Sequence, residues 1–430
     1  MSPLNLTDVV DKINSALNPD TLFRLGRRTG FVFRRRDIPP DLLATALIGS
    51  LATKDVESLA DLQRGYNALT DKRVHYKPFY NQLAKPTFAL FSHQVSAHLP
   101  DTLALTTPAP ISHCALAAFS DILLQDGSSF AVHNGLAELF PGRFTKVSPA
   151  AVELHTTMSL YREQPLKVVL TPDSTGERAY LPLPDTLRGK LILADRGYLD
   201  ILYCQRVKVS GGAIIVRGKN CLNPTVRRCF VSGTEYPELA GKKLNKILDV
   251  LRDCHADIDV DWTKKGETIR LRLVMYWDPS HRTHMYLVNN LVREDFDIEA
   301  VRALYRLRWQ IELLFKEWKS YANLHRFQTE KAPIVEGLIW ASLAAATIKR
   351  FFAQATQLLC EVEISTRIAA MSLMTHLTTV LTAVIERIPL RASVSALILY
   401  LANNAKRAHP KRDKKTGRTR FGIINLPQLC

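Results

Sequence analysis

Residues 305–320 constrain the fold more than any other segment, because their pattern suits only a helix that lies on a core. Six apolar residues fall on one side of such a helix: Leu304, Leu307, Ile311, Leu314, Phe315 and Trp318. Beside this stripe, four polar residues project within an arc of about 60°: Tyr305, Arg308, Glu312 and Lys319. The segment therefore predicts one helix that buries an apolar face and presents, next to it, a carboxylate flanked by two cations and a phenol.

A simpler interpretation is an ordinary amphipathic helix in which Arg308 and Glu312 form an i,i+4 ion pair. That interpretation leaves Tyr305 and Lys319 on the same narrow arc without an explanation. We therefore interpret Glu312 as a metal ligand placed beside groups that hold phosphates.

Two upstream aspartates suit the same chemistry. The sequence predicts a strand over residues 121–125 that ends in an acidic turn at Asp126, and a buried strand over 190–194 that runs directly into Asp195. Either aspartate alone is more often a turn residue. Phosphoryl transfer by two metal ions, however, needs carboxylates from separate elements around ions about 4 Å apart. Oxygen ligands of this type favour Mg²⁺ or Mn²⁺.

The charge of the chain favours a polyanionic partner. The 57 Lys and Arg residues outnumber the 41 Asp and Glu residues and give a net charge of +16, which points to nucleic acid more than to an anionic membrane. Arg34, Arg35 and Arg36 form one basic cluster, and residues 72–85 form another. Both suit phosphate contact by a small helical DNA-binding domain, although a solvated basic face is an equal alternative for either cluster alone.

Neither membrane insertion nor secretion is indicated by the sequence. The longest apolar stretch, residues 337–348, falls short of the roughly 18 residues that a spanning helix needs. The N-terminus contains acids and predicts an amphipathic helix rather than a signal peptide. The seven cysteines include no CxxC pair, so reduced thiols are expected. A zinc site at Cys221, Cys229, Cys254 and His255 lacks the short paired spacings of such sites.

Changes in pattern divide the chain into five parts. Residues 1–105 predict a helical N-terminal DNA-binding domain, and 106–219 the first part of a core of strands and helices. Residues 220–292 predict a β-rich insertion, and 293–360 the second part of the core with the Glu312 helix. Residues 361–430 predict a helical C-terminal region that ends in a basic tail at 406–420.

The chain resembles the DDE transposases of bacterial insertion sequences, in the group named after insertion sequence four. Tyr305, Arg308, Glu312 and Lys319 match the spacing of its Y-R-E-K signature, and the strings Asp126-Gly127-Ser128 and Asp195-Arg196-Gly197 resemble the settings of its first and second acids. The resemblance implies an α/β fold with an RNase H-like core, a mixed sheet flanked by helices, which the β-rich insertion interrupts.

The resemblance also implies a chemistry. Cut-and-paste transposition would use Asp126, Asp195 and Glu312 as catalytic ligands of two Mg²⁺ or Mn²⁺ ions. Phosphates of the transposon end would be held by Tyr305, Arg308 and Lys319, with further DNA contacts from Arg217 and Lys219. In relatives that form a DNA hairpin an aromatic residue stacks on a flipped base; here Tyr286 stands in that stretch, without the expected Trp.

The expected partners are double-stranded DNA, as terminal inverted repeats and target, and a second copy of the chain in a synaptic complex. The expected location is the cytoplasm of a bacterium, associated with the nucleoid. Two alternatives remain open: a catalytically inactive or domesticated DNA-binding protein of the same fold, and a general nuclease that is indifferent to end sequence.

Overall fold

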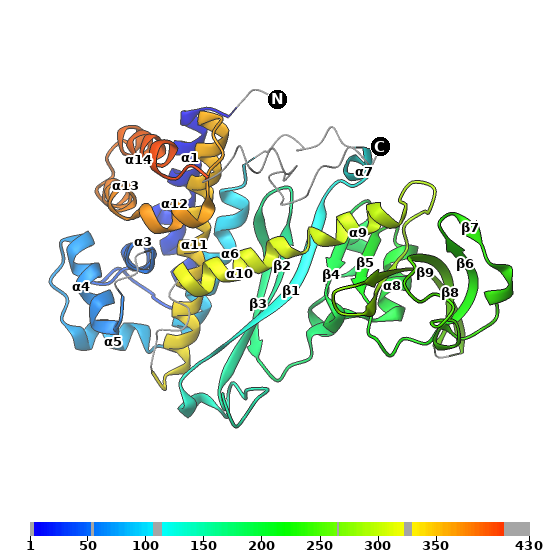
Figure 1. The fold of residues 1–430 in the computed structure, drawn as a ribbon. Coiled ribbons are helices and arrows are strands. Elements are labelled where there is room, and N and C mark those ends of the chain that lie inside the picture. The colour runs from blue at the N-terminus through cyan, green and yellow to red at the C-terminus, as the bar shows by residue number, and fades with distance from the viewer. Residues whose placement is uncertain (1–3, 53–55, 106–113, 265, 322–328, 408–430) are drawn as a thin grey trace.

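The computed structural model describes residues 4–52, 56–105, 114–264, 266–321 and 329–407. Its centre is a ten-stranded sheet in the order β3-β2-β1-β4-β5-β10-β9-β8-β6-β7, with a group of helices at one end (Figure 1). The strands are β1 Ile122–Ala131, β2 Ala151–Ser159, β3 Gln164–Pro172, β4 Leu191–Ala194, β5 Ala213–Arg217, β6 Thr225–Val231, β7 Thr234–Glu235, β8 Ala256–Lys264, β9 Glu267–Asp278 and β10 Thr283–Asn289. The pairs β1–β4 and β4–β5 are parallel, so the predicted mixed sheet flanked by helices is confirmed.

Helices cover both faces of the sheet. On one face lie α9 (Ile298–Arg306) and α10 (Trp309–Tyr321), which share a core with Leu191 and Leu193 of β4. On the other face, α8 (Ile201–Val209) shares a core with Ile192 of β4. The alternation of side chains along a strand produces these two cores from one apolar run. The short helix α7 (Cys114–Ala117) precedes β1.

The predicted turn at Asp126 is wrong, because β1 runs through it without interruption. Asp126 pairs with Thr156 and Gly127 pairs with His155 in an antiparallel ladder with β2. The neighbouring strand β2 pairs with β1 along its length and provides a ladder of backbone hydrogen bonds, and these outweigh the local turn preference of an Asp-Gly pair.

The single helix predicted over 305–320 is also wrong in one respect. The chain breaks at Leu307 and Arg308 into α9 and α10, which follow one another across the sheet (Figure 1). At the break the backbone N–H of Arg308 donates to the carbonyl of Tyr305, three residues back, at 3.1 Å. This tighter, 3₁₀-type turn joins two helices whose directions remain similar. The side chain of Asp297 caps α9 by accepting from the N–H of Ala300.

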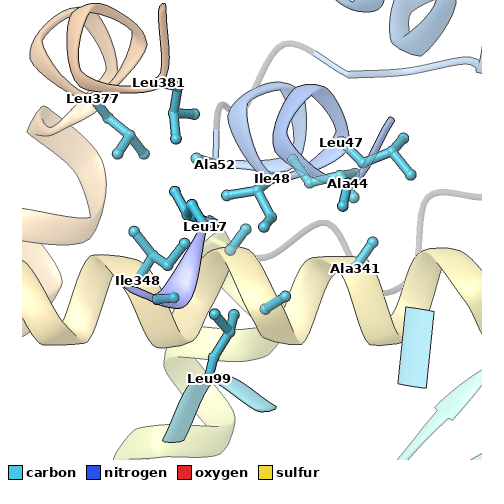
Figure 2. Close-up of a cluster of buried hydrophobic side chains, with 14 of the residues drawn as sticks. Leu17, Ala44, Leu47, Ile48, Ala52, Leu99, Ala341, Ile348, Leu377 and Leu381 are labelled. Carbon is cyan, nitrogen blue, oxygen red and sulfur yellow. The ribbon is translucent and has the colours of Figure 1, made fainter. Parts of the chain in front are cut away.

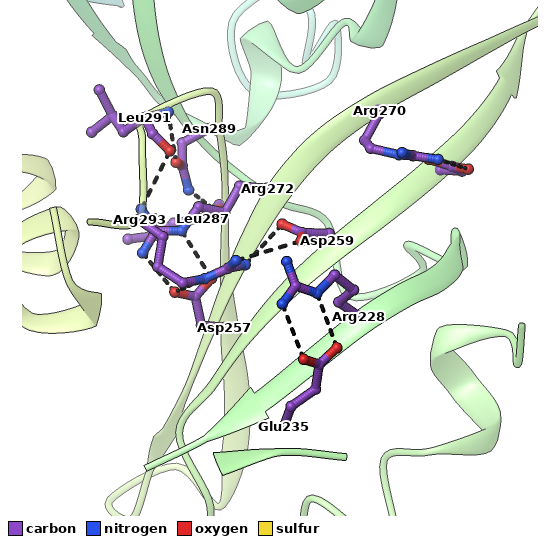
Figure 3. Close-up of polar contacts among 11 residues, drawn as sticks. Arg228, Glu235, Asp257, Asp259, Arg270, Arg272, Leu287, Asn289, Leu291 and Arg293 are labelled. Carbon is purple, nitrogen blue, oxygen red and sulfur yellow. Dashed lines mark hydrogen bonds and ion pairs between the residues drawn. The ribbon is translucent and has the colours of Figure 1, made fainter. Parts of the chain in front are cut away.

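The strands within 220–292 continue the central sheet. β10 pairs with β5, and β9, β8 and β6 follow in order. A buried polar network stabilises this part (Figure 3): Arg272 and Arg293 both donate to the carboxylate of Asp257, at 2.7–3.2 Å, and Arg293 also reaches Asp259. Arginines pair both carboxylates, so the buried charges are compensated.

Helices from both ends of the chain form one group. They are α1 Leu6–Ala16, α2 Pro19–Arg28, α3 Pro40–Leu51, α4 Leu59–Thr70, α5 Tyr76–Leu83, α6 Thr87–Thr102, α11 Ala332–Cys360, α12 Thr366–Ser372, α13 Met374–Glu386 and α14 Arg391–Asn404. Leu17, Ile48 and Leu99 pack in the same core as Ile348 and Leu381 (Figure 2). The regions predicted as 1–105 and 361–430 thus share a core. Residues 408–420 of the predicted basic tail lie outside the described residues.

The 29-residue helix α11 is long and apolar enough to cross a membrane, but 83% of its most apolar window is buried inside the protein. It serves as the central core helix between the helical group and the sheet (Figure 1). An ion pair between Glu317 and Arg350, at 2.7 Å, connects α10 to it. Both side chains are largely buried, so this pair helps to fix the position of α10.

Gly337 of α11 allows α6 to approach closely. A Cβ atom at Gly337 would stand 2.3 Å from the ring of Phe88, which is fully buried. We expect Gly337→Ala to gain about 1 kcal/mol of helix propensity and to lose about 1–3 kcal/mol through overpacking. The net result should be a lower midpoint of thermal unfolding. Gly176→Ala is the control, because a Cβ there meets nothing within 4 Å; equal effects of the two changes would contradict this account.

Candidate active site

Asp126 and Asp195 come from neighbouring strands and lie on the same face of the sheet. Asp126 is in β1, and Asp195 directly follows β4, which pairs with β1 in parallel. Leu124, two residues before Asp126, and Leu193, two residues before Asp195, both belong to the core beneath α9 and α10. Because side chains two residues apart share a face of a strand, both aspartates are directed towards these helices.

The break between α9 and α10 brings three polar side chains to the aspartates. The Arg308 guanidinium donates to Asp126 Oδ2 at 2.7 Å and to Glu312 Oε1 at 2.6 Å. The Tyr305 hydroxyl donates to Asp195 Oδ1 at 3.3 Å. Carboxylates from three separate elements thus each contact Arg308 or Tyr305, two residues that are three positions apart on the helical segment.

This cluster is largely removed from solvent. The side chain of Arg308 is 12% exposed, that of Asp126 18% and that of Glu312 27%. Burial raises the pKa of Asp126 to about 6, against the lowering effect of Arg308, and the nearby charges of Asp195 and Glu312 raise it further. Burial also raises the pKa of the Tyr305 phenol. The site thus holds an acid whose ionised form is disfavoured by burial and by the neighbouring acids.

The other residues predicted for DNA contact lie at different depths in the protein. Lys319 is exposed on α10. Arg217 ends β5, and its charge acts on Tyr305. Lys219 lines a cavity of about 540 Å³ that is also bordered by Arg178, Lys243 and Lys264. Tyr286 is only 5% exposed, so its ring is not accessible for stacking on a base.

The basic residues of the N-terminal region lie apart from the three acids. Arg34 and Arg36 line a cavity of about 820 Å³ together with Lys72, Arg73 and Lys85. The two basic clusters recognised in the sequence therefore face one cavity. Arg35 pairs with the buried Asp41 at 3.1 Å instead.

Sequence reasoning missed a group of polar residues on the opposite face of β1 and β2. Glu153 and His155 of β2 are 3% and 1% exposed, and Tyr198 is 2% exposed. Burial raises the pKa of Glu153 to about 7 and lowers that of His155 to about 4. The signal was present, because polar residues at every second position of an otherwise apolar strand predict a polar face. That face is buried here rather than solvated.

The donor set suits a divalent cation, although the three acids do not yet surround one position. Among the described residues, no group of three or more His, Cys, Asp and Glu side chains is close enough to hold a metal ion. Asp126 and Glu312 nevertheless both direct an oxygen at the same guanidinium. Carboxylate oxygens are the ligands that Mg²⁺ and Mn²⁺ prefer, so the chemistry of these residues fits such an ion.

The comparisons of sequence with known proteins agree with one another. The family described as "Transposase DDE domain" matches residues 118–348. The transposase for insertion sequence element IS231C of Bacillus thuringiensis subsp. berliner is 26% identical over 371 residues, which is 77% of each chain. The transposase for insertion sequence element IS1151 of Clostridium perfringens is 23% identical over 351 residues, 72% of this chain and 74% of that one. Among solved structures, a piggyBac transposase synaptic complex with hairpin DNA matches with a TM-score of 0.45 at 13% identity, over 96% of this chain and 87% of that chain.

Proposed function

This chain belongs to the transposase DDE domain family and is a DNA-cleaving and strand-transferring enzyme of that kind, and from this premise we propose that it moves an insertion sequence by cut-and-paste transposition. Asp126, Asp195 and Glu312 are the proposed catalytic acids. The observation that carries the proposal is that Asp126 of β1 and Glu312 of α10 share the Arg308 guanidinium, while Asp195, at the end of β4, accepts from the nearby Tyr305 hydroxyl.

The proposed reaction is phosphoryl transfer with two Mg²⁺ or Mn²⁺ ions held by the three acids. When bound, such ions supply activation of the attacking oxygen and stabilisation of the leaving oxygen. Tyr305, Arg308 and Lys319 would hold phosphates of the transposon end, with Arg217 and Lys219 on the DNA that leads away from the site. This assignment is supported by their cationic or phenolic chemistry and, for Tyr305 and Arg308, by their contacts with Asp195 and Asp126.

The remaining parts of the proposal concern architecture and partners. An RNase H-like core is supported by the strand order β3-β2-β1-β4-β5, with parallel pairing from β1 to β5. Arg34, Arg35 and Arg36 would grip terminal-repeat DNA from the helical region. Two ends require two sites, so we propose a homodimer in the synaptic complex, acting on the DNA of a bacterial nucleoid.

Cleavage of a labelled duplex that carries the element's own terminal repeat tests the proposal. We expect Mg²⁺-dependent cleavage at the repeat and none on a duplex of scrambled sequence. Equal cleavage of both duplexes would indicate a general nuclease. Binding without cleavage under any divalent metal would indicate the catalytically inactive alternative.

The raised pKa of Asp126 predicts how metal binding depends on pH. A carboxylate must lose its proton before it can bind a metal, and the pKa of Asp126 is about 6 in the metal-free protein. As pH falls through this value, the protonated form grows, so the apparent metal affinity should fall by up to about tenfold per pH unit. Mn²⁺ titrations monitored by electron paramagnetic resonance would measure this; an affinity independent of pH would contradict the role of Asp126.

The salt dependence of end binding tests Lys319. Each phosphate that a protein cation neutralises releases counterions, so Lys319→Ala should weaken end binding and reduce the slope of log affinity against log salt by about 0.9. Lys167→Ala, an exposed change on β3, provides the control. A slope that Lys319→Ala leaves unchanged would count against a phosphate contact.

A further inference from the structure

A second cluster of charged residues lies behind the two aspartates, on the opposite face of the sheet. It consists of Arg143, Glu153, Asp173 and Glu177, here called the Arg143 network. The Arg143 Nη2 atom donates to Glu153 Oε2 at 3.1 Å, and Nη1 lies 3.6 Å from Glu177 Oε1. One guanidinium thus joins a carboxylate from β2 to a carboxylate from the segment before β4.

Asp173 fixes Arg143 between these two acids. The backbone N–H of Arg143 donates to Asp173 Oδ2 at 2.9 Å, and its side chain donates to the carbonyl of Asp173 at 3.2 Å. Ser129 of β1 also donates to the Asp173 carboxylate. The arginine is therefore held by both its backbone and its side chain, a geometry that its planar group with several donors makes possible.

The two outer acids of the network lie directly against glycines that follow the catalytic aspartates. A Cβ atom on Gly127 would stand 2.2 Å from Glu153 Oε1, and a Cβ atom on Gly197 would stand 1.7 Å from Glu177 Oε2. Gly127 is the next residue after Asp126, and Gly197 lies two residues after Asp195. In both places the carboxylate occupies the volume that any other residue would need.

The side chains of the Arg143 network differ in how much of their surface is exposed to solvent. The side chains of Glu153 and Asp173 are 3% and 7% exposed, that of Glu177 is 25% exposed and that of Arg143 is 43% exposed. Buried carboxylates hold their positions only when they are paired. Here one arginine pairs the acids that press on both glycines, so its loss would release both contacts at once.

We propose that Arg143 is a positioning residue that sets the separation of Asp126 and Asp195, by holding Glu153 against Gly127 and Glu177 against Gly197. This role rests on the proposed function, because the quantity it controls is the fit of the two aspartates to divalent metal. Arg143 touches neither aspartate in the contacts described above, and it acts through the backbone of β1 and of the turn after β4. Partners that orient metal ligands typically change metal affinity by about 10–100-fold.

Mn²⁺ titration of the full-length protein, followed by electron paramagnetic resonance, tests the proposal. Arg143→Met keeps much of the side-chain volume and removes the charge. We expect it to weaken Mn²⁺ affinity by about tenfold or more. Lys146→Met, a change at an exposed residue three positions further along the same loop, should leave the affinity unchanged.

A triple variant separates positioning from stability. Arg143→Met alone leaves Glu153 and Glu177 unpaired and should lower the thermal midpoint. Combining it with Glu153→Gln and Glu177→Gln removes the unpaired charges, so we expect the thermal midpoint to recover while Mn²⁺ affinity stays low. Recovery of both would overturn the positioning role, and so would an Arg143→Met variant that binds Mn²⁺ like the wild type.

A further control separates this proposal from the proposed function. Asp126→Asn should abolish the tight Mn²⁺ site in any case. If that variant binds Mn²⁺ as the wild type does, the metal site at the three acids is wrong, and the role of Arg143 falls with it. If only the Arg143 variants behave like the wild type, the metal site stands and the positioning role alone is overturned.

Discussion

Replacing Glu312 by Gln, Asp126 by Asn or Asp195 by Asn is expected to lower metal-dependent cleavage of the terminal repeat by about 10³-fold or more, because ligands that act as a unit cannot substitute for one another. Each change preserves shape and removes one negative charge from the cluster around Arg308. End binding should remain close to that of the wild type, since phosphates are attracted by cations and not by these acids. The measurement is single-turnover cleavage beside a gel-shift assay.

Glu299→Gln is a matched control for this series. Glu299 lies on α9, where its exposed side chain pairs with Arg302 at 3.5 Å. The Glu299→Gln variant should cleave like the wild type. Normal cleavage by a variant of Asp126, Asp195 or Glu312 would remove that residue from the active site. Loss of end binding in the same variant would indicate a folding defect instead.

The second large effect is expected for Arg308→Met, measured as stability with and without Mg²⁺. Arg308 is the cation between Asp126 and Glu312, and its removal leaves those carboxylates close together without a partner. Losing one partner of such a largely buried group costs about 3–5 kcal/mol. We therefore expect a clear fall in the thermal midpoint of the metal-free protein.

Mg²⁺ should reverse most of that loss. If a divalent ion occupies the place that the guanidinium now fills, the variant should gain more stability from Mg²⁺ than the wild type gains, by mass action on the folded state. Arg302→Met, at a half-exposed arginine of α9 that pairs with Glu299, serves as the control. Equal Mg²⁺ stabilisation of Arg308→Met and wild type would contradict competition between Arg308 and the metal.

The sequence predicted which residues of the helical segment lie on one side of it better than it predicted the secondary structure around the acids. The spacing of Tyr305, Arg308 and Glu312 placed them on one side of a helical segment, and a short 3₁₀-type break leaves that relation intact. The position of Asp126 within a strand was missed because an Asp-Gly pair has a strong local turn preference. Only the register with β2, which joins residues far apart in the chain, determines otherwise.

Long-range packing also explains what sequence patterns did not reveal. The strands of 225–289 were expected from their alternation, but their continuation of the central sheet depends on the pairing of β10 with β5. The Arg143 network was not recognised because its acids are widely separated in the sequence and each resembles a surface residue. The burial of Tyr286 was not predicted either, because it follows from the position of this residue in β10 against Gly218.

The common core of the first and last helices has a consequence for how the protein is made. Leu17, Ile48 and Leu99 require Ile348 and Leu381 as packing partners, so the N-terminal region emerges from the ribosome long before its core can close. Contacts over such separations form slowly, and exposed apolar surface in the meantime favours aggregation. We expect the basic cavity at Arg34 and Arg36 to take shape only after synthesis of α14 is complete, so a nascent or prematurely terminated chain would lack it.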